Sequence, residues 1–196
     1  MNILTIFLRV VLISMLAGCA AVGVVKSNDP ATKLADAKVL IFKLDRPLPA
    51  ERLIREAIEI YQKQGDVAGL AEAYRIYGFF FKSGAVDHWA FIYRESGFLD
   101  KTATFDTRYI KSVQYFNMSK AEWAKIGRHD NDSNLELHKA LAYLLMKDTK
   151  RACKAYEASL AADREYAPTG EVKLPPGFTS FADLIQHEKR RAHCEP

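Results

Sequence analysis

The sequence of 196 residues lacks the short motifs with which many enzymes bind a nucleotide or activate a nucleophile. It contains no G-x-S-x-G, no phosphate-binding G-x-x-x-x-G-K-[ST] and no dinucleotide-binding G-x-G-x-x-G. Serine, lysine and glutamate are common in the chain, but their abundance alone identifies no nucleophile. We therefore expect neither an enzymatic activity nor a cofactor.

Recognisable metal-ligand patterns are also missing. The five histidines show no H-E-x-x-H and no paired spacing, and the weak alternative of a site formed by His187, His193 and Cys194 has little to favour it. An acidic run resembles the start of a calcium loop, but Leu135 and Leu141 stand where such a loop needs glycine and a bidentate glutamate. We expect no bound metal ion.

The chain has neither a strong net charge nor a long apolar run. A formal net charge of +4 is too small to indicate nucleic-acid binding. The longest apolar stretch near the N-terminus is a short block from Val10 to Ala17, whereas a membrane-spanning helix needs about 20 such residues. A block of this length is typical of a secretory signal sequence that is removed from the mature protein.

Directly behind this block, Leu16-Ala17-Gly18-Cys19 resembles the lipobox of bacterial lipoproteins. The resemblance implies a signal peptide over residues 1–18, acylation of Cys19 and a lipidated tether over residues 19–28. Two or more acyl chains anchor a protein stably to a bilayer. Because Ala20 stands where an inner-membrane retention signal would have Asp, we expect an outer-membrane anchor facing the periplasm. The alternatives are an ordinary signal peptide or a short buried helix with an incidental cysteine.

The three cysteines leave an even pair once Cys19 is assigned to lipid. Exported chains form disulfides, so we expect a bond between Cys153 and Cys194 that fastens the C-terminal tail. Two free or buried thiols are the alternative, since spacing does not decide between them.

Apolar residues recur at helical spacing along most of the chain. Asp29 and Pro30 are typical of a helix start, the segment Asp45–Pro49 interrupts the pattern, and Gly65-Asp66 predicts a turn between helices over 50–64 and 67–82. Ser133 to Glu136 has the form of a capping box. Helices with one apolar stripe and short connections predict an all-α array of antiparallel hairpins.

Small and aromatic residues in this array resemble those of tetratricopeptide (TPR) repeats. The resemblance implies a TPR-like solenoid over residues 29–163, with about three helix pairs at roughly 30–64, 67–127 and 134–163. The residues that carry it are Ala57, Tyr61, Gly65, Asp66, Gly69, Leu70, Ala71, Ala73, Tyr74 and Gly78, with a weaker set at Ala140, Tyr143, Ala152, Tyr156 and Ser159.

Two segments depart from the repeat. Residues 83–106 form an aromatic-rich insertion, too long for a turn within a repeat, and we expect one or two short helices there. Residues 164–196 begin with a Pro- and Gly-rich loop and continue in a helix over Ser180–Ala192 that we expect to cap the end of the stack.

The function that these features favour is a membrane-anchored adaptor that binds envelope proteins, with no nucleic-acid partner. The TPR resemblance implies contact residues along the first helix of a pair, and the exposed charges of the insertion are a second candidate surface. The expected partner-binding residues are Glu72, Arg75, Phe79 and Lys82 in the repeat and Arg94 and Lys101 in the insertion.

Two other functions stay open at this point. One is an immunity or inhibitor lipoprotein that binds a single effector protein through the insertion. The other is a cell-wall glycan binder or enzyme, for which Trp89 and Trp123 are the candidate stacking residues.

Overall fold

The structure is a computed structural model that describes residues 27–166 and 174–194, and within these ranges it is all-α, with no strand. This confirms the predicted fold class. The predicted signal peptide, Cys19 and most of the tether lie outside the described residues. The elements are α2 (Pro30–Phe42), α3 (Pro47–Gln64), α4 (Val67–Phe81), α5 (Gly84–His88), α6 (Ala90–Ser96), α7 (Arg108–Lys125), α8 (Asp132–Leu145), α9 (Thr149–Glu165) and α10 (Phe181–Arg191).

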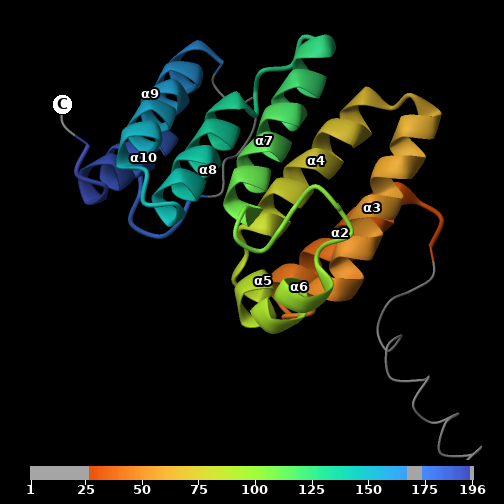
Figure 1. Cartoon of the computed structure of the whole chain (residues 1–196). Coiled ribbons are helices and arrows are strands. Elements are labelled where there is room, and N and C mark those ends of the chain that lie inside the picture. The colour runs from red at the N-terminus through yellow and green to blue at the C-terminus, as the bar shows by residue number, and fades with distance from the viewer. Residues whose placement is uncertain (1–26, 167–173, 195–196) are drawn as a thin grey trace, which may run out of the picture.

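The long helices stand side by side in one row, with α5 and α6 below it and α10 against α9 (Figure 1). The most extensive contacts join α4 to α7, α8 to α9 and α2 to α3, and smaller ones join α3 to α4 and α7 to α8. Each helix therefore buries its apolar stripe against its neighbours in the row. No helix in the described ranges is long and apolar enough to cross a membrane.

Most helices begin and end near the residues that the sequence pattern predicts. The Asp29 side chain accepts a hydrogen bond from the Thr32 amide at 2.8 Å, as expected for an N-cap. Helix α3, however, begins at Pro47, and the predicted interruption through Pro49 is wrong at this end. Proline fits the first helical turn because the amide hydrogens of that turn need no partner within the helix.

The predicted capping box is also wrong. Helix α8 begins at Asp132, so Ser133 lies inside the first turn. Its hydroxyl donates to the Ser159 carbonyl of α9 at 2.9 Å, and the Ser159 hydroxyl donates to the Ser133 carbonyl at 2.7 Å. Glu136 is buried and pairs with Lys120 and Lys139. These side chains therefore join helices to one another and do not cap α8.

Helices α4 and α7 approach closely at Gly78. The Ser112 hydroxyl of α7 donates to the Gly78 carbonyl at 2.7 Å, and the fully buried Phe116 ring lies over the glycine. A Cβ atom at position 78 would stand 2.6 Å from that ring. The absence of a side chain at Gly78 is therefore what permits this packing.

We expect Gly78→Ala to lower the free energy of unfolding by about 1–3 kcal/mol, because Phe116 is enclosed and has no space to move aside. Chemical denaturation of the purified domain measures the effect. Gly84→Ala is the matched control, since nothing lies within 4 Å of a Cβ at that position. If Gly78→Ala were as stable as Gly84→Ala, Phe116 and α7 would have to shift to admit the added methyl group without loss of stability.

The insertion forms α5, α6 and a loop that leads into α7, which confirms the predicted short helices. Three of its aromatic side chains, Tyr93, Phe98 and Phe105, are buried in the same core as α2, α3 and α4, whereas Phe91 is 64% exposed. Most of the aromatic content of the insertion therefore stabilises the fold, and only part of it is left on the surface.

A buried carboxyl group connects the insertion to the helices. Glu51 of α3 is 2% exposed, and its Oε1 accepts hydrogen bonds from the Tyr77 hydroxyl of α4 and from the Leu99 amide, each at 2.8 Å. Burial raises the pKa of Glu51 to about 7, although these hydrogen bonds favour the charged form. Beside it, the Tyr115 hydroxyl of α7 donates to Asp100 Oδ2 at 2.8 Å. The loop at 99–100 is thus fixed to α3 and α7 by polar contacts, and Glu51 also joins α3 to α4.

The C-terminal helix is fixed to α9 by the predicted disulfide. Cys153 and Cys194 are bonded, with their Cα atoms 5.5 Å apart. Ile185 of α10 is fully buried in a cluster with α8 and α9, and Lys189 pairs with Glu157. Helix α10 therefore covers the end of the row, as predicted for the tail.

Candidate functional site: the Phe79 face

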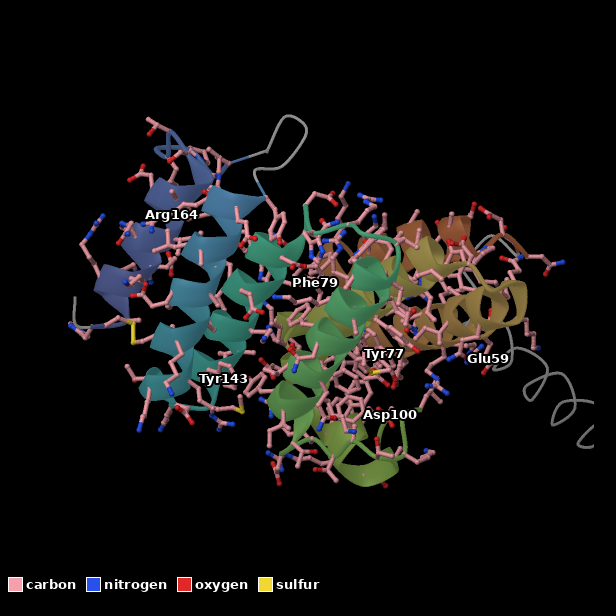
Figure 2. The ribbon with its side chains drawn as sticks, turned by 90° about the horizontal axis from the view of Figure 1, so that it is seen from above. Glu59, Tyr77, Phe79, Asp100, Tyr143 and Arg164 are labelled. Atoms are coloured by element: carbon pink, nitrogen blue, oxygen red, sulfur yellow. A yellow bond between two sulfur atoms is a disulfide. The ribbon has the colours of Figure 1, made fainter. Side chains whose placement is uncertain are left out.

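Four of the predicted partner-binding residues lie together on α4, on a surface that continues onto two other helices. The Phe79 ring meets the Phe42 ring of α2 edge-on at 6.4 Å between centroids, and the His138 ring of α8 edge-on at 4.5 Å. Figure 2 shows Phe79 near the middle of the row, between Glu59 at one end and Arg164 at the other. We call this surface the Phe79 face; its residues are Phe42, Glu72, Arg75, Phe79, Lys82 and His138.

Two cations flank the central ring. The Arg75 guanidinium lies 5.3 Å and the Lys82 ammonium 5.7 Å from the centroid of Phe79, within the range of cation–π attraction. Arg75 also donates two hydrogen bonds to the Glu72 carboxylate, at 2.6 and 2.7 Å. This two-pronged pair neutralises Arg75, so Lys82 is left as the surplus charge of the face.

The surroundings of Lys82 are poorly hydrated. Burial lowers its pKa to about 8, and within residues 27–166 and 174–194 no carboxylate forms an ion pair with it. Its neighbour His138 has a buried Nδ1 without a hydrogen-bond partner in the described chain. The pKa of His138 is lowered to about 3, mainly by burial and further by the positive charges of Lys82 and Arg75. This imidazole is therefore neutral at ordinary pH.

Phe42 and His138 are the two members of the face that the sequence did not identify. Phe42 is the last residue of α2 and is 58% exposed, which is unusual for phenylalanine at the end of an apolar stripe. His138 is one of the five histidines that show no metal-ligand spacing, and nothing else in the sequence marks it. Their position beside Phe79 depends on how α2, α4 and α8 are placed in space, and no local pattern encodes that placement.

The predicted insertion residues lie on a separate surface. Arg94 pairs with Asp106 at 3.0 Å and covers one side of Phe105 at 4.3 Å from the ring centroid, and Lys101 is exposed. Arg94 and Asp106 line a cleft of about 360 Å³ between α6 and the following loop. Because both charges are exposed, their pairing contributes little to stability.

The two tryptophans do not form a sugar-stacking platform. Trp123 is 6% exposed, and the Arg128 guanidinium lies 4.2 Å from its ring centroid, which covers the face that a sugar would need. Trp89 is half-buried, and its indole nitrogen donates to the Asp45 carbonyl at 3.0 Å. Of the two candidate stacking residues, Trp123 is therefore not accessible to a sugar, and Trp89 is only partly so.

The alternative metal site loses its thiol, because Cys194 is bonded to Cys153. In the part of the chain that the structure describes, no group of three or more His, Cys, Asp or Glu side chains is placed to hold a metal ion.

Comparisons with known proteins found no relative of this chain. No protein-family model matches the chain, and neither a curated protein nor a solved structure matches it.

Proposed function

We propose that this protein is a lipid-anchored adaptor of the bacterial envelope, with a TPR-like helical domain that binds a partner protein at the Phe79 face. The observation that carries the proposal is the face itself. It presents exposed Phe42, the flanked ring of Phe79 and Lys82, which forms no ion pair within the described residues. Aromatic and arginine side chains at the centre of a surface are typical of protein–protein hot spots, and here they are Phe42, Phe79 and Arg75.

The arrangement of helices supports the TPR-like part of the proposal. The extensive contacts of α2 with α3, α4 with α7 and α8 with α9 agree with three helix pairs. The Phe79 face takes Phe42, Phe79 and His138 from α2, α4 and α8, which are the first helices of the three pairs. First helices line the binding surface of TPR-like folds, so the face lies where that resemblance implies it.

The lipid anchor rests on the Leu16–Cys19 block. We place the mature protein at the outer membrane, facing the periplasm, and the disulfide supports an oxidising compartment of this kind.

An inhibitor-type lipoprotein is the second candidate, and the cleft beside Arg94 favours it. Such a protein would bind one effector through the insertion, with the Phe79 face left unused. The two candidates therefore place the partner on different surfaces of the same domain.

Affinity purification of the tagged chain from detergent-solubilised envelopes tests the adaptor function. We expect one envelope protein in stoichiometric amount with the wild type and with Arg94→Glu, and its loss with Phe42→Ser. Because both side chains are exposed, neither substitution is expected to change the melting temperature. A small effector lost with Arg94→Glu but retained with Phe42→Ser would favour the inhibitor, and no stoichiometric partner would contradict the adaptor.

The anchor has its own test. Cys19→Ser is expected to abolish acylation and to release the protein into the soluble fraction, because the serine hydroxyl does not replace the thiol that takes the lipid. Fractionation and intact mass measure this, with Ser14→Ala in the apolar block as the control that should stay lipidated. A Cys19→Ser protein that still requires detergent for extraction would contradict the proposal.

A further inference from the structure

Lys82 differs from the other lysines that are withdrawn from solvent. Every other described lysine that is not exposed pairs with a carboxylate of this chain, and Lys82 alone has none. The paired lysines are Lys33 with Glu56, Lys111 with Asp100, Lys120 with Glu136, Lys139 with Glu136 and Lys189 with Glu157.

An ammonium group without a partner is costly to withdraw from water, and proteins usually offset the cost with a nearby carboxylate. Within residues 27–166 and 174–194, no carboxylate pairs with Lys82. The Glu72 carboxylate is paired with Arg75. The imidazole of His138 is neutral, and among the described residues its Nδ1 has no hydrogen-bond partner. A negative charge supplied from outside the described residues would offset this cost.

We propose that the Phe79 face binds an acidic segment of a partner protein, in which an Asp or Glu carboxylate pairs with Lys82 and an adjacent apolar side chain contacts Phe42 and Phe79. This inference rests on the adaptor function and names the chemistry of its partner. Binding neutralises the surplus charge and removes apolar surface from water in the same step.

The composition of the face favours such a segment over other anions. A single surplus cation does not suit nucleic acid or an anionic membrane, which are bound by clusters of lysine and arginine. Phe42 is 58% exposed and adjoins Phe79, so the occupant also needs an apolar group within reach of its carboxylate. A protein segment that alternates acidic and large apolar residues meets both requirements.

The protonation of Lys82 makes the interaction sensitive to pH. With a pKa of about 8, the ammonium form is predominant at pH 7 and scarce at pH 9. The neighbouring His138 does not titrate in this interval, because its pKa is lowered to about 3. We expect the affinity for an acidic segment to fall about tenfold between pH 7 and pH 9, in proportion to the protonated fraction.

Fluorescence polarisation with the purified full-length domain, the signal peptide removed, tests this inference. The probe is a labelled, C-terminally amidated peptide Gly-Asp-Phe-Glu-Leu-Asp-Gly, compared with its Asn and Gln counterpart Gly-Asn-Phe-Gln-Leu-Asn-Gly. We expect the acidic peptide to bind more tightly than the amide peptide, and Lys82→Gln to weaken it about tenfold and to remove the pH dependence. Lys82→Arg should retain binding but lose the decline between pH 7 and pH 9, since arginine keeps its charge.

Lys154→Gln, an exposed lysine of α9, is the matched control and should bind as the wild type does. Because Lys82 is withdrawn from water and forms no ion pair within the described residues, Lys82→Gln should keep the melting temperature of the wild type, so lost binding would not reflect unfolding. The inference would be overturned if Lys82→Gln bound the acidic peptide as tightly as Lys154→Gln, or if the acidic and amide peptides bound equally. It would also be overturned by no binding at millimolar peptide, or by binding only of a peptide with a free C-terminal carboxylate. An envelope partner retained by Lys82→Gln would overturn it while leaving the adaptor function intact.

Discussion

Glu51→Leu is expected to lower the free energy of unfolding by about 3 kcal/mol at pH 5, the largest loss we expect from a single substitution in this chain. Leucine nearly fills the volume of the side chain but accepts no hydrogen bond. The Tyr77 hydroxyl and the Leu99 amide would then be buried without partners. Urea denaturation measures the loss, and Glu59→Leu, at an exposed position of the same helix, is the control.

Glu51→Gln separates the charge from the hydrogen bonds. The pKa of Glu51 is raised from 4.5 to about 7 in the folded chain, so its favourable contribution is complete below pH 4.5 and is lost as the pH rises through 7. Glutamine keeps an oxygen for Tyr77 and Leu99 and does not ionise. Relative to the wild type, Glu51→Gln should therefore gain about 3 kcal/mol between pH 4 and pH 8.

The change with pH in the stability difference between Glu51→Gln and the wild type tests whether burial raises the pKa of Glu51. All other titrating groups are common to both proteins and cancel. A constant difference across this range would mean that Glu51 ionises in the fold as easily as in water, and the burial argument would be wrong. A Glu51→Leu protein as stable as the wild type would show that the insertion is held by apolar contacts alone.

Removal of the disulfide is expected to have an effect of similar size. The bond closes a loop with a sequence separation of 41, which corresponds to about 4 kcal/mol in the chain-entropy account. In the double variant Cys153→Ala, Cys194→Ala, helix α10 is held to α9 mainly by buried Ile185 and by the pair of Lys189 with Glu157. We expect α10 to open locally before the rest of the domain.

Hydrogen exchange measured by mass spectrometry resolves this order. Peptides that cover 181–191 should exchange much faster in the double variant, whereas those that cover 112–119 of α7 should be unchanged. Ile185→Ala with the disulfide intact is the control for packing alone. Uniform loss of protection over all helices, or no change in α10, would contradict the role assigned to the bond.

Local features of the fold could be predicted from the sequence because they depend on neighbouring residues. Asp29 with Pro30 starts α2, and Gly65 ends α3 with a left-handed backbone. The bond between Cys153 and Cys194 was predicted from cysteine count and the expected compartment. In each case the physical cause is contained in a short segment or in the composition.

Features that join distant segments could not be predicted in this way. Glu51 has the pattern of an ordinary helix glutamate, and only the fold brings the Leu99 amide to it. Ser133 has the sequence of a cap, but contact between α8 and α9 gives its hydroxyl another partner. Likewise, the TPR resemblance implied that Lys82 lies on a binding surface, while its burial without a carboxylate partner among the described residues depends on how the helices pack.

The central claim is that a partner protein binds at the Phe79 face. Photo-cross-linking in intact cells tests it most directly, with p-benzoylphenylalanine placed at Phe42 or, as the matched control, at Phe91 of the insertion. Both positions are exposed phenylalanines, at 58% and 64%, so the probe replaces a similar side chain in each. We predict one discrete adduct from position 42 and none from position 91. An adduct from position 91 alone, or from neither position, would contradict the account.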